Sequence, residues 1–211
     1  MTVCLQLDHV NYSYGAAKIR VLSDVNADFE SGKMYAITGP SGAGKSTLLS
    51  LLAGLDAPSD GVVRFEGEDI ATTGYSKHRH EHVSLVFQDH NLIDYLTPEE
   101  NLRLVNPKAD MKILEDLGLS REESKRNIMH LSGGQRQRVA VGRALVAPGR
   151  AILADEPTGS LDPEMTDEVI DLLRHAAHQL GKCVIVVTHS KRVADSADAV
   201  YTLRHKKLAK A

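Results

Sequence analysis

The feature that most constrains the fold of this chain is a glycine-rich loop between a strand-like segment and a helical pattern. Residues 33–38 predict a strand that enters the loop, and leucines recur at helical spacing over residues 48–55. The loop fits the spacing G-x-x-x-x-G-K-[ST]. It consists of Gly39, Pro40, Ser41, Gly42, Ala43, Gly44, Lys45, Ser46 and Thr47. Strand, loop and helix in this order predict a phosphate-binding loop rather than an ordinary glycine turn.

Each part of this loop has a chemical reason. Glycines let the backbone turn tightly and bring its N–H groups against phosphate oxygens. The helix that follows points its positive end at the same oxygens. Lys45 supplies a mobile cation for the terminal phosphates, and the Ser46 hydroxyl is placed to ligate Mg²⁺.

Composition narrows the class of protein. The length of 211 residues suits one α/β domain, and the net charge of −3 gives no electrostatic pull toward nucleic acid, so no nucleic-acid partner is expected. Cys4 and Cys183 are expected to be reduced and buried. No apolar run approaches the ~20 residues of a membrane span, and no signal-peptide pattern opens the chain. We therefore expect a cytosolic protein whose membrane link comes through a partner.

Two apolar runs end in polar side chains suited to phosphate chemistry. Residues 151–154 lead into Asp155 and Glu156, and residues 183–188 lead into His189. Continuous apolar runs are typical of parallel strands buried on both faces, and ligands bind at the carboxyl edge of such sheets. One carboxylate can hold Mg²⁺ through its waters while the other orients and polarises an attacking water. We expect these residues and the glycine-rich loop to meet at one sheet edge.

A second helix start carries bare glycines. Ser132 and Gln135 have the spacing of a capping box, which places Gly133 and Gly134 in the first helical turn. Glycine costs helix stability there. Two alternatives remain open at this point: a flexible hinge, or a second anion site in which exposed backbone N–H groups and the helix dipole face a phosphate.

Two short segments are ambiguous. Tyr12 and Tyr14 precede a glycine turn, where an aromatic ring can present its face to a base, although a surface or strand tyrosine is the ordinary interpretation. His78, His80 and His82 alternate and would share one face of a strand, where they could bind a metal. Because no cysteine or carboxylate accompanies them at fixed spacing, we expect a polar linker before a strand over residues 83–87.

The motifs together resemble the nucleotide-binding subunit of an ABC (ATP-binding cassette) transporter, over the stretch from about Leu5 to about Leu203. The most specific matches are the loop 39–47, the segment 131–135 (hereafter the signature segment) and the strand 151–154 with its two carboxylates. Gln88, residues 160–162 and His189 fit the remaining motifs, and no essential position departs from the pattern.

The resemblance implies an α/β fold. It comprises a P-loop NTPase core with a mainly parallel sheet, an N-terminal antiparallel β-subdomain and an inserted small α-helical subdomain. The sequence agrees with the insertion, because short helical patterns with capping boxes fill the stretch after Asn91. We expect one ABC ATPase domain over residues 1–211, with 1–90 and 130–211 as core and 91–129 as helical subdomain.

The resemblance also implies a role for each site residue, with ATP and Mg²⁺ as the bound species. Tyr14 would stack on adenine, with Tyr12 as the fallback. Glu156 would be the catalytic base, His189 a switch touching the γ-phosphate, and Gln88 a sensor of Mg²⁺ and water that also faces the membrane partner. The implied catalytic residues are Lys45, Gln88, Glu156 and His189. The implied metal ligands are Ser46, Gln88 and Asp155. The implied nucleotide contacts are Tyr14, Gly39 to Thr47, Gln88, Ser132, Gly133, Gly134, Gln135 and Asp162.

A dimer follows from the same resemblance. The signature segment would contact the γ-phosphate of ATP held by a second copy of the chain, which gives a two-fold head-to-tail pair with two shared sites. Integral membrane permease subunits are the other implied partners, and they would hold the chain on the inner face of the cell membrane.

Three functions are compatible with this family. Residues 87–92 and 100–102 are similar to the lipoprotein-release and macrolide-export group, so the leading hypothesis is an ATPase motor for export or extraction. The alternative is an ATP-dependent regulatory subunit of a cell-division or cell-wall complex that does not transport. A DNA-repair or translation ATPase is not expected, because those resemble longer chains with a coiled-coil insert or two cassettes.

Overall fold

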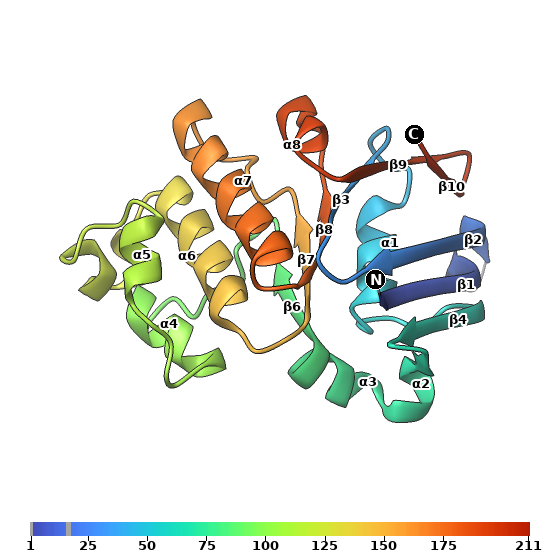
Figure 1. Ribbon diagram of the computed structural model, residues 1–211, viewed down its shortest axis with the longest axis horizontal. Coiled ribbons are helices and arrows are strands. Elements are labelled where there is room, and N and C mark those ends of the chain that lie inside the picture. The colour runs from blue at the N-terminus through green and yellow to red at the C-terminus, as the bar shows by residue number, and fades with distance from the viewer. Residues whose placement is uncertain (1, 16–17) are drawn as a thin grey trace.

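The computed structural model describes residues 2–15 and 18–211, and in it helices and a smaller sheet pack on a central, mainly parallel sheet (Figure 1). The central strand order is β10-β9-β3-β8-β7-β6. Its members are β3 (Met34–Thr38), β6 (Val83–Val86), β7 (Ala151–Asp155), β8 (Cys183–Val187), β9 (Ala199–Arg204) and β10 (Lys207–Lys210). The pairs from β9 to β6 are parallel, and β10 adds an antiparallel edge. The predicted parallel core is confirmed.

The N-terminal part of the chain forms a separate antiparallel sheet with the order β2-β1-β4-β5. Its strands are β1 (Val3–Tyr14), β2 (Ile19–Glu30), β4 (Asp60–Phe65) and β5 (Glu68–Asp69). Their alternating burial leaves one face toward the core, as half-buried antiparallel strands require. The expected β-subdomain is therefore present.

Alternate residues of the central strands face two different cores. On β7, Ala151 and Leu153 pack with α1 (Lys45–Leu52) and the antiparallel sheet, whereas Ile152 and Ala154 pack with α6 (Gly133–Val146) and α7 (Pro163–His178). All four side chains are fully buried. Since both faces of the strand are covered, no polar face remains, which explains the continuous apolar runs of the sequence.

Short helical elements fill the chain between β6 and α6. They are α4 (Pro98–Val105), α5 (Lys112–Asp116) and the 3₁₀ turns η2 (Glu123–Lys125) and η3 (Ile128–His130). A capping box begins α4: the Glu100 amide donates to the Thr97 hydroxyl over 3.2 Å, and the Thr97 amide donates to the Glu100 carboxylate over 2.8 Å. The division into a core and a helical subdomain over 91–129 stays a prediction, which this element order supports.

The histidine-rich segment differs from both sequence interpretations. Short helices α2 (Ile70–Thr73) and α3 (Tyr75–Lys77) lead into a π-helical turn, η1 (His78–His82), rather than a strand face or a linker. The turn brings the Nδ1 atoms of His78 and His82 within 3.3 Å and leaves His80 exposed. Within the described chain, no group of three or more His, Cys, Asp or Glu side chains is arranged to hold a metal ion. Alternation at period two therefore gave the wrong local structure.

Other expectations concern the cysteines and the membrane. Cys4 and Cys183 are free and buried, as predicted. Across residues 2–15 and 18–211, no helix has the length and apolar character needed to cross a bilayer. The last helix, α8 (Lys191–Asp195), follows the end of β8.

Candidate active site

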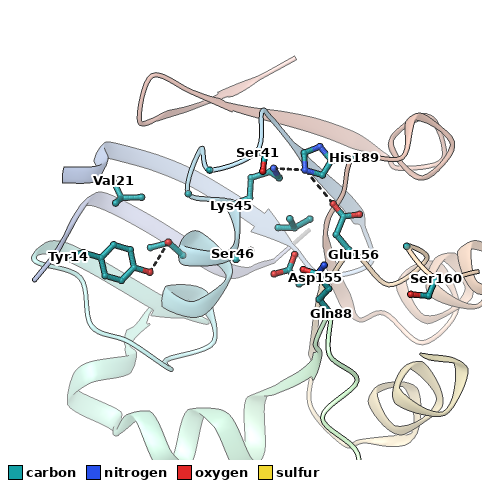
Figure 2. Close-up of a pocket in the computed structure, with 15 residues that line it drawn as sticks. Tyr14, Val21, Ser41, Lys45, Ser46, Gln88, Asp155, Glu156, Ser160 and His189 are labelled. Atoms are coloured by element: carbon teal, nitrogen blue, oxygen red, sulfur yellow. Dashed lines mark hydrogen bonds and ion pairs between the residues drawn. The ribbon is translucent and has the colours of Figure 1, made fainter. Parts of the chain in front are cut away.

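A pocket of about 640 Å³ lies at the carboxyl edge of the central sheet (Figure 2). The segments that follow β3, β6, β7 and β8 all reach it, as the strand-end argument predicted. The expected residues that line it are Tyr14, Ser41, Gly42, Gly44, Lys45, Ser46, Thr47, Gln88, Asp155, Glu156 and His189. Its size falls in the range of small-molecule sites.

Two glycines of the loop are required by close packing. Gly39 has φ 151°, and a Cβ there would lie 2.4 Å from the Leu203 carbonyl oxygen on β9. Gly44 has φ 101°, and its Cβ would lie 2.6 Å from Val21 Cγ1 on β2. Backbone conformation and space both exclude a side chain at these positions, so the loop backbone can approach a ligand closely.

Lys45 begins α1 and is almost fully buried. Its ammonium donates to the carbonyl oxygens of Gly39 over 3.0 Å and Pro40 over 3.1 Å, and its Nζ lies 3.1 Å from His189 Nε2. Because an ammonium is only a donor, His189 Nε2 accepts in this contact. The cation is thus held at the loop by neutral acceptors that an anionic phosphate oxygen can replace.

Glu156 has an under-solvated carboxylate in a strained backbone position. Its φ is 47°, and its amide donates to the Val187 carbonyl over 3.0 Å. The Thr188 hydroxyl donates to Oε2 over 3.3 Å, while Oε1 lies 3.8 Å from His189 Nε2 and has no hydrogen-bond partner among the residues described. Burial raises the pKa of Glu156, against the opposing effects of His189 and Thr188. Such a carboxylate is suited to accept a proton from, and to orient, a water molecule.

The side chains proposed to hold Mg²⁺ share this pocket. Ser46, Gln88 and Asp155 line it, and Figure 2 shows Asp155 beside the Gln88 side chain. A hydroxyl, an amide and a carboxylate are hard oxygen donors, which Mg²⁺ prefers, and this ion usually keeps waters and substrate phosphates as further ligands. The residues present therefore fit the ion chemically.

The turn that carries Gln88 is fixed to helix α6. His90 and Asn91 follow Gln88 with φ values of 63° and 48°. Arg143 of α6 donates to the Asn91 carbonyl over 2.7 Å and reaches the His90 carbonyl over 3.4 Å. Burial lowers the pKa of Arg143, so these carbonyls hold a largely desolvated cation. The contact joins the Gln88 turn to the helix that starts after Ser132.

The signature segment lies outside the pocket of its own chain. Its capping box is complete: the Gln135 amide donates to Ser132 Oγ over 3.2 Å, and the Ser132 amide donates to the Gln135 side chain over 2.8 Å. A Cβ at Gly133 would meet nothing within 4 Å, and one at Gly134 would lie 3.4 Å from the Ser160 carbonyl. A well-capped helix start with bare backbone favours an anion site over a flexible hinge.

Some predicted residues lie elsewhere, and some lining residues had no motif. Asp162 caps α7 by accepting from the Met165 amide over 2.9 Å and is not among the residues lining the pocket. The same holds for Gly39, Pro40 and Ala43 of the loop. Sequence reasoning missed four lining residues, namely Val21, Gly159, Ser160 and Val187. Val21 and Val187 are ordinary strand valines without any signal, whereas the other two adjoin the recognised 160–162 segment.

Tyr12 does not fit its fallback role. It is only 6% exposed, whereas Tyr14 is 49% exposed and lines the pocket. The stacking assignment of Tyr14 therefore agrees with its position, and Tyr12 must act, if at all, from behind it.

Comparison with known proteins gives consistent results. Residues 22–159 match the family described as ABC transporter. The chain is 37% identical to the Bacillus subtilis protein named uncharacterized ABC transporter ATP-binding protein YclH, over 92% of this chain and 90% of that protein. It is 38% identical to the Escherichia coli K12 macrolide export ATP-binding/permease protein MacB, over 97% of this chain but 34% of that protein.

Solved structures show the same relationship. The dimeric structure of MJ0796, a bacterial ABC transporter cassette, superposes with a TM-score of 0.90 at 32% identity, covering 98% of both chains. A second dimeric MJ0796 structure, in a post-hydrolysis state with ADP and Pi, superposes with a TM-score of 0.88 at 32% identity and the same coverage.

Proposed function

Because the chain belongs to the ABC transporter family and is an ATP-hydrolysing cassette, we propose that it is the motor subunit of an export or extraction complex in the membrane. In this proposal two copies close head to tail around two ATP molecules. Each ATP lies between the Lys45 loop of one copy and the Ser132 helix start of the other.

The observation that carries this proposal is the place of the signature segment. Gly133 and Gly134 present bare backbone at a helix N-terminus, yet they lie outside the pocket that holds Lys45. A phosphate at this helix start therefore has to come from another molecule, and a second copy carries a suitable one. The dimeric state of the similar MJ0796 cassette supports the same arrangement.

The pocket residues divide the hydrolytic work. Lys45 and the loop amides bind and orient the triphosphate, and Glu156 accepts a proton from the attacking water. His189, between Lys45 and Glu156, reports whether the terminal phosphate is present (Figure 2). Mg²⁺, held by Ser46, Gln88 and Asp155, would supply charge neutralisation at the phosphate oxygens. Loss of the terminal phosphate weakens the contact between the copies and lets the pair open.

The membrane partner is proposed to be an integral permease that contacts the Gln88 side. The 38% identity to a protein named for macrolide export supports an export-type partner, although this chain spans only 34% of that protein. Beside the Gln88 turn a groove of about 360 Å³ opens, lined by residues that include Phe87, Leu104, Val105 and Arg143. A permease segment docked there would hold the chain on the inner face of the membrane and read the state of the turn.

Two measurements test this proposal. Sedimentation of the purified chain with ATP and Mg²⁺ under slow-turnover conditions is expected to show dimers that ADP does not support. Affinity purification from membranes is expected to recover a polytopic permease. A constitutive dimer indifferent to nucleotide would contradict ATP-driven closure, and a partner complex that moves no substrate would favour the regulatory alternative.

Replacing Tyr14 by Ala tests the base platform. We expect ATP affinity to fall about five- to a hundredfold, the range of one base–aromatic stacking contact. Binding of inorganic tripolyphosphate should be unchanged because the loop is untouched. Calorimetric titration of both ligands measures the difference, with Tyr95→Ala as a control at a 79% exposed tyrosine. Equal losses for both ligands would remove Tyr14 from the stacking role.

A further inference from the structure

We propose that Tyr12 is a positioning residue for the nucleotide base, because with Asp56 and Thr47 it braces Tyr14 against both ends of helix α1. Tyr12 itself does not line the pocket among the residues described there. The inference rests on the proposed stacking role of Tyr14. It adds a determinant of base affinity that has no contact with the nucleotide.

The first contact of this brace joins Tyr12 to the far end of α1. The Tyr12 hydroxyl donates to the Asp56 carboxylate, and this hydrogen bond, followed by burial, raises the pKa of Tyr12. The other Asp56 oxygen accepts from the Ala57 amide over 2.8 Å, which fixes the carboxylate. Asp56 lies in the turn that follows α1, so Tyr12 is tied to the C-terminal end of that helix.

The second contact joins the two tyrosine rings. They meet edge to face, with centroids 4.8 Å apart and an interplanar angle of 86°. This is a favoured geometry for an aromatic pair. Tyr12 is buried and anchored, whereas Tyr14 is half exposed, so the buried ring sets the tilt of the exposed one.

The third contact joins Tyr14 to the near end of α1. Its hydroxyl lies 3.0 Å from Thr47 Oγ1, and Figure 2 shows the Tyr14 ring directed toward this helix. Thr47 belongs to the first turn of α1, next to the loop residues that hold phosphate. The ring is thus fixed at its edge and at its hydroxyl, while its position on the pocket wall remains open to a base.

Helix α1 therefore sets the separation of base platform and phosphate loop. It runs over 8 residues, about 12 Å, and its N-terminal end is the phosphate loop itself. A platform tied to both ends of this helix keeps its orientation before the nucleotide arrives. Such preorganisation lowers the entropic cost of binding, and only ligands that carry a base gain from it.

The test replaces Tyr12 by Phe, which keeps the ring and removes its anchor to Asp56. We expect ATP to bind about two- to tenfold more weakly, the range of one aromatic contact. The affinity for inorganic tripolyphosphate should stay unchanged. In turnover assays KM for ATP should rise while kcat stays constant, because the base is remote from the reacting phosphate. Asp56→Ala, which removes the anchor from the other side, is expected to give the same selectivity.

Tyr35→Phe provides the matched control. Tyr35 is another buried tyrosine of the same core, and its hydroxyl accepts from the Glu30 amide over 2.9 Å. Its loss should lower the melting temperature without changing the ratio of ATP to tripolyphosphate affinity. Equal weakening of both ligands in Tyr12→Phe, or an unchanged ratio, would overturn the positioning role. The Tyr14→Ala result separates the two failures, because selective loss there with an unaffected Tyr12→Phe variant contradicts only the brace.

Discussion

Glu156→Gln is expected to abolish ATP turnover while leaving ATP able to hold two copies together. The amide keeps the size and much of the hydrogen bonding of the side chain but cannot accept a proton from water. Loss of a positioned general base typically costs 10²–10⁴-fold, so we expect kcat to fall by at least about a hundredfold. ATP binding should persist because Lys45, the loop and Tyr14 are unchanged.

The measurements are phosphate release for turnover and sedimentation for assembly. The variant should form dimers with ATP and Mg²⁺ that persist for the length of the experiment, whereas the unmodified chain dissociates as ATP is consumed. Glu164→Gln, at an exposed position in the first turn of α7, is the matched control and should behave like the unmodified chain. Unchanged turnover in Glu156→Gln would remove this carboxylate from the role of base.

The same substitution is expected to raise the free energy of unfolding at neutral pH. Burial raises the pKa of Glu156 in the folded state, so the folded chain binds this proton more tightly than the unfolded chain does. Ionisation therefore disfavours folding, and this cost develops as pH rises from the unfolded-state pKa toward the folded-state pKa. A neutral amide removes it. A base kept under-solvated for catalysis thus lowers stability at its own site.

Positions at strand ends were predictable because burial leaves a clear trace in sequence. A parallel strand covered on both faces, such as β7, has no polar position until it emerges at the sheet edge. Asp155, Glu156 and His189 stand at such exits, and the structure places all three around the Lys45 loop. The capping box at Ser132 was predictable for a similar reason, because its two hydrogen bonds depend only on local spacing.

Side-chain contacts between distant segments left no such trace. The tie between Tyr12 and Asp56 joins β1 to the turn after α1, and neither residue type nor spacing signals it. Val21 lines the pocket only because β2 runs past Gly44. The histidine segment failed differently. His78 packs between the end of α1 and β4, its Nε2 lying 2.9 Å from the Leu52 carbonyl, and this tertiary contact favours a π-helical turn over alternation.

Lys45→Ala is expected to produce the largest loss of nucleotide affinity of any single substitution considered for this chain. Lys45 is the cation that the structure holds at the glycine-rich loop, bonded to the Gly39 and Pro40 carbonyls. A charge-assisted hydrogen bond to phosphate is worth about 1.5–3 kcal/mol, which corresponds to about ten- to a hundredfold in affinity. Titration calorimetry with ATP and with inorganic tripolyphosphate should show equal losses, because the missing contact is to phosphate and not to the base.

Lys182→Ala separates this effect from the simple loss of a buried lysine. Lys182 donates to the Ala147 carbonyl over 2.6 Å and the Gly149 carbonyl over 2.9 Å, and burial lowers its pKa. It thus resembles Lys45 in burial and in its backbone acceptors, but it lies outside the set of residues described as lining the nucleotide pocket. Its removal should reduce the melting temperature and leave ATP affinity unchanged. If Lys45→Ala bound ATP and tripolyphosphate normally, the phosphate would have to be held elsewhere, and the closure of two copies around it would lose its physical basis.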